Sequence, residues 1–177
     1  MIDKKILKQI LDSREARSDK QRELISKYNK SLISFTLNIP GKVKDSPNYR
    51  NIHREGMKAI LNKLEEKAIP IIYKESFNKI TGSEGYIVVD LNPIDLKKIT
   101  VEIEENHFLG RIFDIDVFDS YHNQISRSDL KTSPRKCLLC NNDARVCMRM
   151  KTHTYEELIN KIYETWEKYK NKETLAK

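Results

Sequence analysis

The sequence predicts a single α+β domain spanning residues 1–177, with helices packed on a mixed β-sheet. After a helical N-terminal segment, strand-like and helical spacings of apolar residues follow in the order strand, helix, strand, strand, helix, strand, strand. A hydrophobic content of 38% and a charged content of 33% describe a globular chain that is long enough to bury one core.

The overall composition narrows the classes of partner. A net charge of +7 favours anionic partners, which include nucleic acids, phosphorylated small molecules and acidic proteins. No apolar run has the length of a membrane span, and the chain does not start like a secretory signal, so we expect a cytoplasmic protein with no membrane partner. Three cysteines crowded between Cys137 and Cys147 argue against a disulfide framework.

Residues 1–30 are predicted to be a helical segment, either continuous or broken. Its apolar stripe is interrupted by a charged stretch from Asp12 to Arg22, which is typical of a solvated helix face with alternating charges. Within that stretch, Arg14 or Arg17 remains a candidate to face a phosphate.

A strand over residues 31–38 leads into a basic loop and a second helix. Ser46 and Pro47 begin this helix, which extends to about residue 68. A basic loop that feeds a helix N-terminus suits an anion, since backbone N–H groups and the helix dipole both point at it. The residues expected to contact phosphate are Asn38, Lys42, Lys44 and Arg50. The glycine motifs of P-loop and Rossmann proteins are absent.

The middle of the chain is predicted to add two strands and a helix. Residues 69–80 and 85–90 have strand-like composition and are separated by a glycine-containing turn. Asn92 and Pro93 start a helix that reaches about Asn106, although part of that segment also alternates as a strand would. Further on, residues 125–127 are expected to form a short return strand.

The segment 113–117 has the pattern of a strand with one chemical face. Asp114 and Asp116 point to one side, whereas the apolar residues that alternate with them point to the other. Two carboxylates about 6.5 to 7 Å apart repel each other, so they take up a proton or bind a cation. A divalent ion such as Mg²⁺ would serve phosphoryl or nucleotidyl transfer, with Arg111 as a bidentate phosphate binder. The plainer interpretation is a strand with two solvated acids.

Residues 131–153 are predicted to be a basic loop that contains all three cysteines. The C-x2-C spacing of Cys137 and Cys140, followed by Cys147 and His153, fits a tetrahedral Zn²⁺ site with three thiolates and one imidazole. The alternative is that these are free cysteines, which fill space as small buried hydrophobes. The nearby basic residues that we expect to hold a phosphate or an acidic partner are Arg127, Arg135 and Lys136.

A C-terminal helix is predicted over residues 154–175. Thr154 and Glu157 form a capping box, and the apolar stripe that follows is typical of a helix packed on a core.

Taken together and in this order, these segments resemble the apo-citrate lyase phosphoribosyl-dephospho-CoA transferase family, the holo-ACP synthases of citrate lyase. The matching pieces are SFTLNIPG at 34–41, TGSEGY at 81–86, GRIFDIDV at 110–117, ISR at 125–127 and RKCLLC at 135–140, with Cys147, Arg149 and His153. The resemblance covers nearly the whole chain.

The resemblance implies a transferase with no nucleic-acid partner. It would move phosphoribosyl-dephospho-CoA from 2'-(5''-triphosphoribosyl)-3'-dephospho-CoA to a serine of the acyl carrier (gamma) subunit of citrate lyase, releasing pyrophosphate. In this nucleotidyl transfer, Asp114 and Asp116 would hold Mg²⁺ while Arg111 and the loop cations grip the pyrophosphate. The general base stays open among Asp119, Asp129 and Glu102.

One spacing departs from the wider nucleotidyltransferase superfamily, which places a Gly-Ser motif shortly before its D-x-D motif. Here Gly82 and Ser83 precede Asp114 by about thirty residues, so a nucleotidyltransferase-like fold requires an insertion or a different site geometry. Ser83 therefore has a weak claim to phosphate binding. The alternative function is a basic nucleic-acid-binding module with a zinc knuckle, in which two acids facing a phosphate would repel the ligand.

Overall fold

A computed structural model describes residues 4–175 and shows an α+β domain, as the sequence predicts. Residues 1–3, which belong to the predicted N-terminal helical segment, and residues 176–177 lie outside the described part of the chain. In chain order, the elements are α1 (Lys4–Tyr28), β1 (Ser31–Leu37), α2 (Pro47–Glu66), β2 (Ile71–Phe77), β3 (Glu84–Val89), α3 (Pro93–Asn106), the 3-10 helix η1 (Gly110–Ile112), β4 (Phe113–Phe118), β5 (Gln124–Ile125), α4 (Ala144–Met150) and α5 (Tyr155–Leu175).

The strands form one sheet in the order β2-β3-β1-β4-β5, and each neighbouring pair is antiparallel. The connections β1-α2-β2 and β3-α3-β4 each pass over one strand, which is the split βαβ arrangement of ferredoxin-like folds. The sheet differs in this respect from the mixed sheet that we expected. The two strands that each helix connects are parallel, but a third strand lies between them, so no parallel pair is hydrogen-bonded within residues 4–175.

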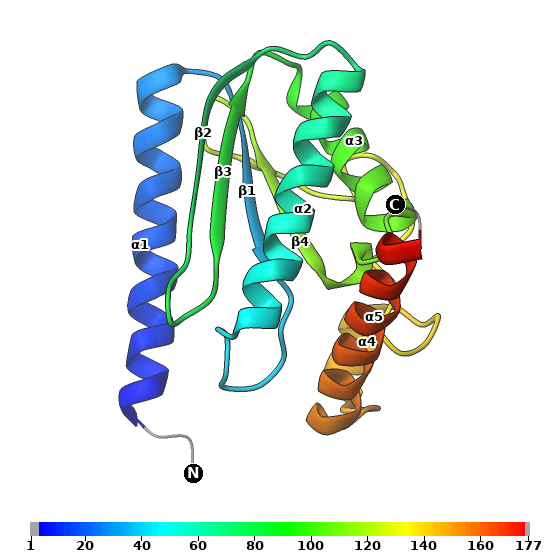
Figure 1. The fold of residues 1–177 in the computed structure, drawn as a ribbon. Coiled ribbons are helices and arrows are strands. Elements are labelled where there is room, and N and C mark those ends of the chain that lie inside the picture. The colour runs from blue at the N-terminus through cyan, green and yellow to red at the C-terminus, as the bar shows by residue number, and fades with distance from the viewer. Residues whose placement is uncertain (1–3, 176–177) are drawn as a thin grey trace.

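Different helices cover the two faces of the sheet (Figure 1). Helices α2 and α3 pack on one face, and α1 lies along the other. On the first face, Phe35 of β1 and Phe113 of β4 pack beneath the helices, and Trp166 of α5 joins this larger core. On the other face, Leu24 of α1 packs with Tyr86 of β3 in a smaller cluster. Successive residues of a strand therefore enter different environments.

The helices start at the capping residues that the sequence predicts. Ser46 Oγ accepts a hydrogen bond from a backbone N–H of the first turn of α2 at 3.1 Å, and Asn92 Oδ1 accepts one in α3 at 2.9 Å. At the start of α5, the Thr154 N–H donates to the Glu157 carboxylate and the Glu157 N–H donates to Thr154 Oγ1. None of the helices within residues 4–175 is both long enough and apolar enough to span a membrane.

The segment 131–153 is not the uninterrupted loop that we predicted, because it contains helix α4. Asp143 caps the start of this helix by accepting a hydrogen bond from the Arg145 N–H at 2.7 Å. Lys151 ends it in the left-handed conformation, with φ of 49°.

Helix α2 packs closely on the sheet at Gly56. A Cβ at this position would lie 2.3 Å from Cζ of Phe35 and 3.0 Å from the Phe113 ring. The Phe35 ring is fully buried, stacks on His53 at a centroid distance of 4.5 Å and meets Phe113 edge-on. Because neighbours surround this ring, it has little room to move away from a larger residue at position 56.

Gly56→Ala is therefore expected to destabilise the protein by about 1–3 kcal/mol, the usual cost of overpacking a core. At an exposed helix position the same change would instead stabilise by roughly 1 kcal/mol. Urea denaturation measures the difference, and adding Phe35→Leu should recover part of the loss. A Gly56→Ala variant as stable as the parent would show that α2 is not held this close to β1.

Candidate functional site

Strand β4 places Asp114 and Asp116 on the same face of the sheet. The two acids are half-buried, whereas the apolar residues that alternate with them lie in the core. On the neighbouring strand β1, Thr36 lies opposite Asp114 and Ser34 lies opposite Asp116. This face is the one that α1 covers, because Ser34 Oγ accepts a hydrogen bond from Gln21 Nε2 of that helix at 2.9 Å. The acids thus share one side of the strand, as their alternation predicts.

Charged side chains of α3 hold the outer edge of β4. Glu104 accepts a hydrogen bond from the Ile115 N–H at 3.1 Å, and Lys97 donates to the Ile115 carbonyl at 2.9 Å. Both side chains are buried, and burial lowers the pKa of Lys97. The Arg127 guanidinium completes the network by donating to Glu104 and to Glu105, each at 2.7 Å. Arg127, which we predicted to bind substrate, thus helps to fix β4 and also lines the second cleft described below.

A cleft of about 180 Å³ opens beside Asp114, between α1, the end of β1 and the turn before β3. Its lining combines this acid with cationic, amide and hydroxyl groups. The polar residues that line it include Arg14, Arg17, Thr36, Asn38, Lys44 and Ser83. Two of the four loop residues predicted to contact phosphate, Asn38 and Lys44, thus reach the cleft, and so do both arginines of the charged stretch in α1.

Two positive side chains, Lys44 and Arg14, line this cleft. Lys44 donates to the Ile39 carbonyl, and its pKa is lowered by burial and by the positive charge of Arg14. Neither Lys44 nor Arg14 forms an ion pair with any residue that the structure describes. Arg17, by contrast, pairs with the buried Glu84 at 3.3 Å. An anion bound in the cleft would relieve the repulsion between Lys44 and Arg14.

The turn at Gly82 and Ser83 lines the same cleft as Asp114, although about thirty residues separate them in the sequence. Gly82 has φ of 112°, a conformation that favours glycine. Ser83 Oγ donates to Asn78 Oδ1 at 2.7 Å, which fixes the hydroxyl. No local pattern reveals this proximity, because it arises only when β3 and β4 take their places on either side of β1.

The remaining loop cations and Arg135 have different surroundings. Arg135 lies at the cleft, where its guanidinium donates to Asp114 Oδ1 at 3.0 Å. Lys42 lines a neighbouring groove of about 240 Å³. Arg50 lines neither space and forms a two-point pair with Asp45, at 2.7 and 2.5 Å.

Arg111, which we expected to act in catalysis, contacts the cysteine segment. Its guanidinium donates to the carbonyls of Cys137 at 3.0 Å and Cys140 at 3.4 Å. Together with Arg135 and Lys136, it lines a second cleft of about 280 Å³. The two clefts adjoin through Arg135, whose guanidinium also donates to the Arg111 carbonyl at 3.3 Å.

The three acids considered as general base are engaged elsewhere. Asp119 accepts hydrogen bonds from backbone N–H groups of the turn that follows it, and Asp129 accepts from the backbone and side chain of a neighbouring serine. Glu102 pairs with Lys63 at 2.7 Å. None of the three lines the cleft at Asp114.

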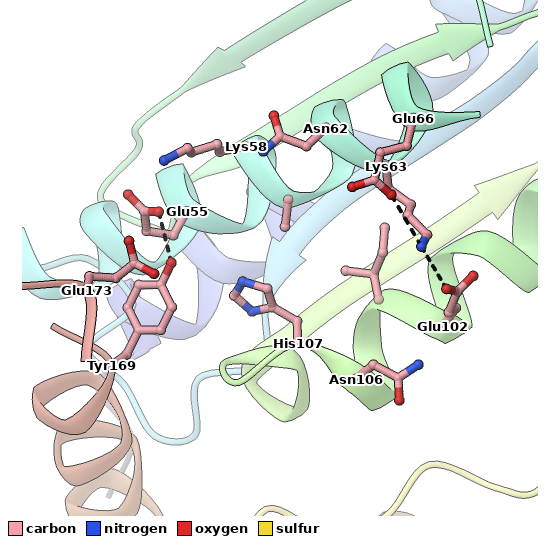
Figure 2. A pocket seen from close by; sticks show the side chains of 12 residues that line it. Glu55, Lys58, Asn62, Lys63, Glu66, Glu102, Asn106, His107, Tyr169 and Glu173 are labelled. Atoms are coloured by element: carbon pink, nitrogen blue, oxygen red, sulfur yellow. Dashed lines mark hydrogen bonds and ion pairs between the residues drawn. The ribbon is translucent and has the colours of Figure 1, made fainter. Parts of the chain in front are cut away.

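A further cleft, of about 390 Å³, lies across the sheet from Asp114, between α2, α3 and α5 (Figure 2). Lys63 bridges Glu66 and Glu102 in this cleft, and Tyr169 donates to Glu55 at 3.1 Å. Its charged lining comprises four glutamates and two lysines, so it suits a phosphate less well than the cleft at Asp114 does.

The structure also brings together the four residues that we considered as zinc ligands. The ligand atoms of Cys137, Cys140, Cys147 and His153 all lie within 4.8 Å of one another. This cluster is distinct from the cleft at Asp114 but lies in the segment that carries Arg135.

The chain is similar to known proteins over most of its length. Residues 5–169 match the family described as apo-citrate lyase phosphoribosyl-dephospho-CoA transferase. The chain is 36% identical over 154 residues to the protein of that name from Escherichia coli O7:K1 (strain IAI39 / ExPEC), covering 87% of this chain and 84% of that protein. It is 35% identical, with the same coverage, to the proteins of that name from Escherichia coli O1:K1 / APEC and Shigella boydii serotype 18 (strain CDC 3083-94 / BS512).

Asp116 carries an electrostatic cost in this arrangement. Burial, followed by the negative charge of Asp114, raises the pKa of Asp116 to about 6, while Lys97 and a 2.7 Å hydrogen bond from Gln124 oppose the shift. The folded chain therefore binds this proton more tightly than the unfolded chain. The contribution of this proton to the free energy of unfolding falls as the pH rises from 3.8 to about 6, and none of it remains at pH 7.

Asp116→Asn is expected to stabilise the metal-free protein at pH 7 by about 1–3 kcal/mol, because it removes the charge and keeps an acceptor for Gln124. The gain should shrink as the pH falls through about 6 and vanish below about 4. Denaturation of both proteins in the presence of chelator, across this pH range, measures the effect. Asp95→Asn, at an exposed position in α3, is the matched control and should show no such gain. Equal stability of Asp116→Asn and the parent at pH 7 would contradict the raised pKa of Asp116.

Proposed function

The chain belongs to the apo-citrate lyase phosphoribosyl-dephospho-CoA transferase family, and from this we propose that it is a nucleotidyltransferase-type enzyme acting at the cleft of Asp114. Its donor would be 2'-(5''-triphosphoribosyl)-3'-dephospho-CoA. Its acceptor would be a serine of the apo acyl carrier (gamma) subunit of citrate lyase, and pyrophosphate would be released. The observation that carries the proposal is that Asp114, which shares its face of β4 with Asp116, lines the same cleft as Arg14 and Lys44 in a chain from this family.

The proposed reaction sets clear demands on a site. The serine oxygen forms a bond to the phosphorus next to the ribose, and the bond from that phosphorus to the departing pyrophosphate breaks. Pyrophosphate keeps the electron pair of the broken bond, and the serine proton passes to a base or to water. The site must therefore hold the triphosphate in line with the serine and offset the charge that builds on the leaving group.

The donor atoms near Asp114 fit a hard divalent cation. Asp114 is 44% exposed and shares its face of β4 with Asp116, and Thr36 Oγ1 lies 3.5 Å from Asp114 Oδ2. Mg²⁺ prefers oxygen ligands and uses one or two carboxylates, leaving its other positions to water and phosphate. We therefore propose the two acids as its ligands. When bound, Mg²⁺ would supply positive charge to the phosphate oxygens.

The cations around the cleft suit the triphosphate. Arg14 and Lys44 present positive charge that no acid neutralises in the described chain, at the side of the cleft formed by α1 and the loop after β1. Arg135 pairs with Asp114 at 3.0 Å. If a metal cation replaced Arg135 as the partner of Asp114, the Arg135 guanidinium would be free to bind the leaving pyrophosphate. A guanidinium binds such a group at two points.

The nucleic-acid-binding alternative is less well supported. The carboxylates of Asp114 and Asp116 would repel a phosphodiester backbone that entered this cleft without a cation. The family name also describes a transferase, not a nucleic-acid-binding module.

Incubating the protein with the apo carrier subunit, the triphosphoribosyl precursor and Mg²⁺ should increase the intact mass of the carrier by one phosphoribosyl-dephospho-CoA group. Asp114→Asn is expected to lower kcat at least about a hundredfold, because it removes charge from the proposed metal ligand at the site of phosphate transfer. The same loss is expected for Asp116→Asn. Circular dichroism should show that both variants remain folded.

Asp95→Asn provides the matched control for these variants. It removes an exposed acid of α3 that pairs only with its neighbour Lys98 among the described residues, so transfer should continue at the parent rate. Normal transfer by both β4 variants would overturn the proposed mechanism. If the carrier gained no mass in the presence of the parent enzyme, the proposed activity would be wrong.

A further inference from the structure

The cluster in the cysteine segment has the geometry of a closed metal site. Cys140 Sγ lies 3.5 Å from Cys147 Sγ and 3.4 Å from His153 Nε2, and the ligand atom of Cys137 lies within 4.8 Å of the others. A tetrahedral Zn²⁺ ion with three thiolates and one imidazole places its sulfur atoms about 3.8 Å apart and sulfur and nitrogen about 3.6 Å apart. The separations of Cys140 from Cys147 and from His153 are close to those values, and Cys137 lies within reach of the same ion.

The backbone around the cluster is folded so that all four side chains converge. The Cys137 N–H donates to the Asn142 carbonyl at 2.8 Å, which closes a hairpin around the C-x2-C pair. Helix α4 then carries Cys147. The left-handed residue Lys151 turns the chain after α4, so that His153 comes back to the cysteines. The convergence therefore involves three successive local structures: a hairpin, a helix and a turn.

Apolar burial offers this segment little support. Val146, Met148 and Met150 of α4 are 51%, 76% and 71% exposed, so three of the helix's apolar side chains contribute little to the core. The helix has only seven residues, which is too short to be stable by itself. A segment of this kind requires another source of stability, and a metal cross-link between its parts is one that small folded units commonly use.

The charges around the cluster fit a metal site with a net charge of about −1, which is the sum for Zn²⁺ and three thiolates. The Arg111 guanidinium donates to the carbonyls of Cys137 and Cys140. Further cations of the same segment include Arg135, Lys136, Arg145 and Arg149.

We propose that Cys137, Cys140, Cys147 and His153 bind one structural Zn²⁺ ion. On binding, the three thiols release their protons to water and the neutral imidazole coordinates through Nε2. Four protein ligands complete the tetrahedron, so no position remains for a substrate and the metal serves the fold.

The ion would also position a residue of the neighbouring cleft. Arg135 lies two residues before Cys137, and its guanidinium reaches Asp114 at 3.0 Å. By holding the hairpin that begins at Cys137, Zn²⁺ would fix the backbone from which Arg135 extends. This consequence rests on the proposed function, whereas the zinc site itself does not.

Metal analysis provides the first test. Full-length protein purified without chelator should contain about one zinc per chain. Protein freed of metal under reducing conditions should bind Co²⁺ with the absorption bands of a tetrahedral thiolate site, and Zn²⁺ should displace it. Loss of the metal should also expose residues 131–153 to proteases while the sheet stays protected.

Two histidine variants form a matched pair for the second test. His153→Asn should weaken Zn²⁺ affinity at least about a hundredfold, because loss of a ligand costs more than loss of an outer contact. His122→Asn changes an exposed turn residue with φ of 67°, which asparagine tolerates, and should leave Zn²⁺ affinity unchanged.

Three results would overturn the zinc site. The first is reduced, folded protein that binds neither Zn²⁺ nor Co²⁺, and the second is equal Zn²⁺ affinity in the two histidine variants. The third is native protein with a single titratable thiol and a mass lower by two hydrogens, which would identify a disulfide between two of the cysteines. Metal content and carrier modification are measured separately, so failure of the zinc site would leave the proposed transferase activity standing, and the reverse also holds.

Discussion

The candidate site depends on the way in which the open edge of β4 is paired. At Ile115, the backbone groups on that side bond to the side chains of Glu104 and Lys97 rather than to a strand. Buried charges are costly unless they are matched, and Arg127 matches Glu104 at 2.7 Å. Strand β4 directs its apolar residues into the core and Asp114 into the cleft. By fixing the strand, this network therefore fixes the positions of the apolar residues and of Asp114. The loop that carries Arg127 is thereby tied to the same strand.

Features that rest on local chemistry could be predicted from the sequence. Ser46, Asn92 and Thr154 mark the starts of three helices because a capping side chain acts within one turn of its own position. The alternation in β4 separates the acids from the core for the same local reason. The directions of neighbouring strands could not be predicted in this way. They depend on which strand lies between the two that a helix connects. Helix α4 was not predicted, because the seven residues after Asp143 are too few to show a helical period.

The roles of the arginines could not be assigned in the same way. A guanidinium offers the same donors to a carboxylate, a backbone carbonyl or a phosphate, so only tertiary placement decides which one it binds. Arg127 finds Glu104, which lies 23 residues earlier, and Arg111 finds the carbonyl of Cys137, which lies 26 residues later. Arg14 is the converse case. Its charged surroundings are typical of a solvated helix face, and only the packing of α1 across the sheet brings it to the cleft of Asp114.

Like charges held close together distinguish this cleft and the adjoining acid Asp116 from an ordinary polar surface. Burial and the charge of Arg14 lower the pKa of Lys44, and burial and the charge of Asp114 raise the pKa of Asp116, so Lys44 and Asp116 each resist ionisation. Stability therefore does not explain the charges of Lys44 and Asp116, and such perturbed groups are typical of functional sites. A simple anion would satisfy only the cations, and a metal ion alone would satisfy only the acids. A polyphosphate that carries a divalent cation satisfies both pairs at once. The charge pattern of the cleft therefore favours that class of ligand over either component separately.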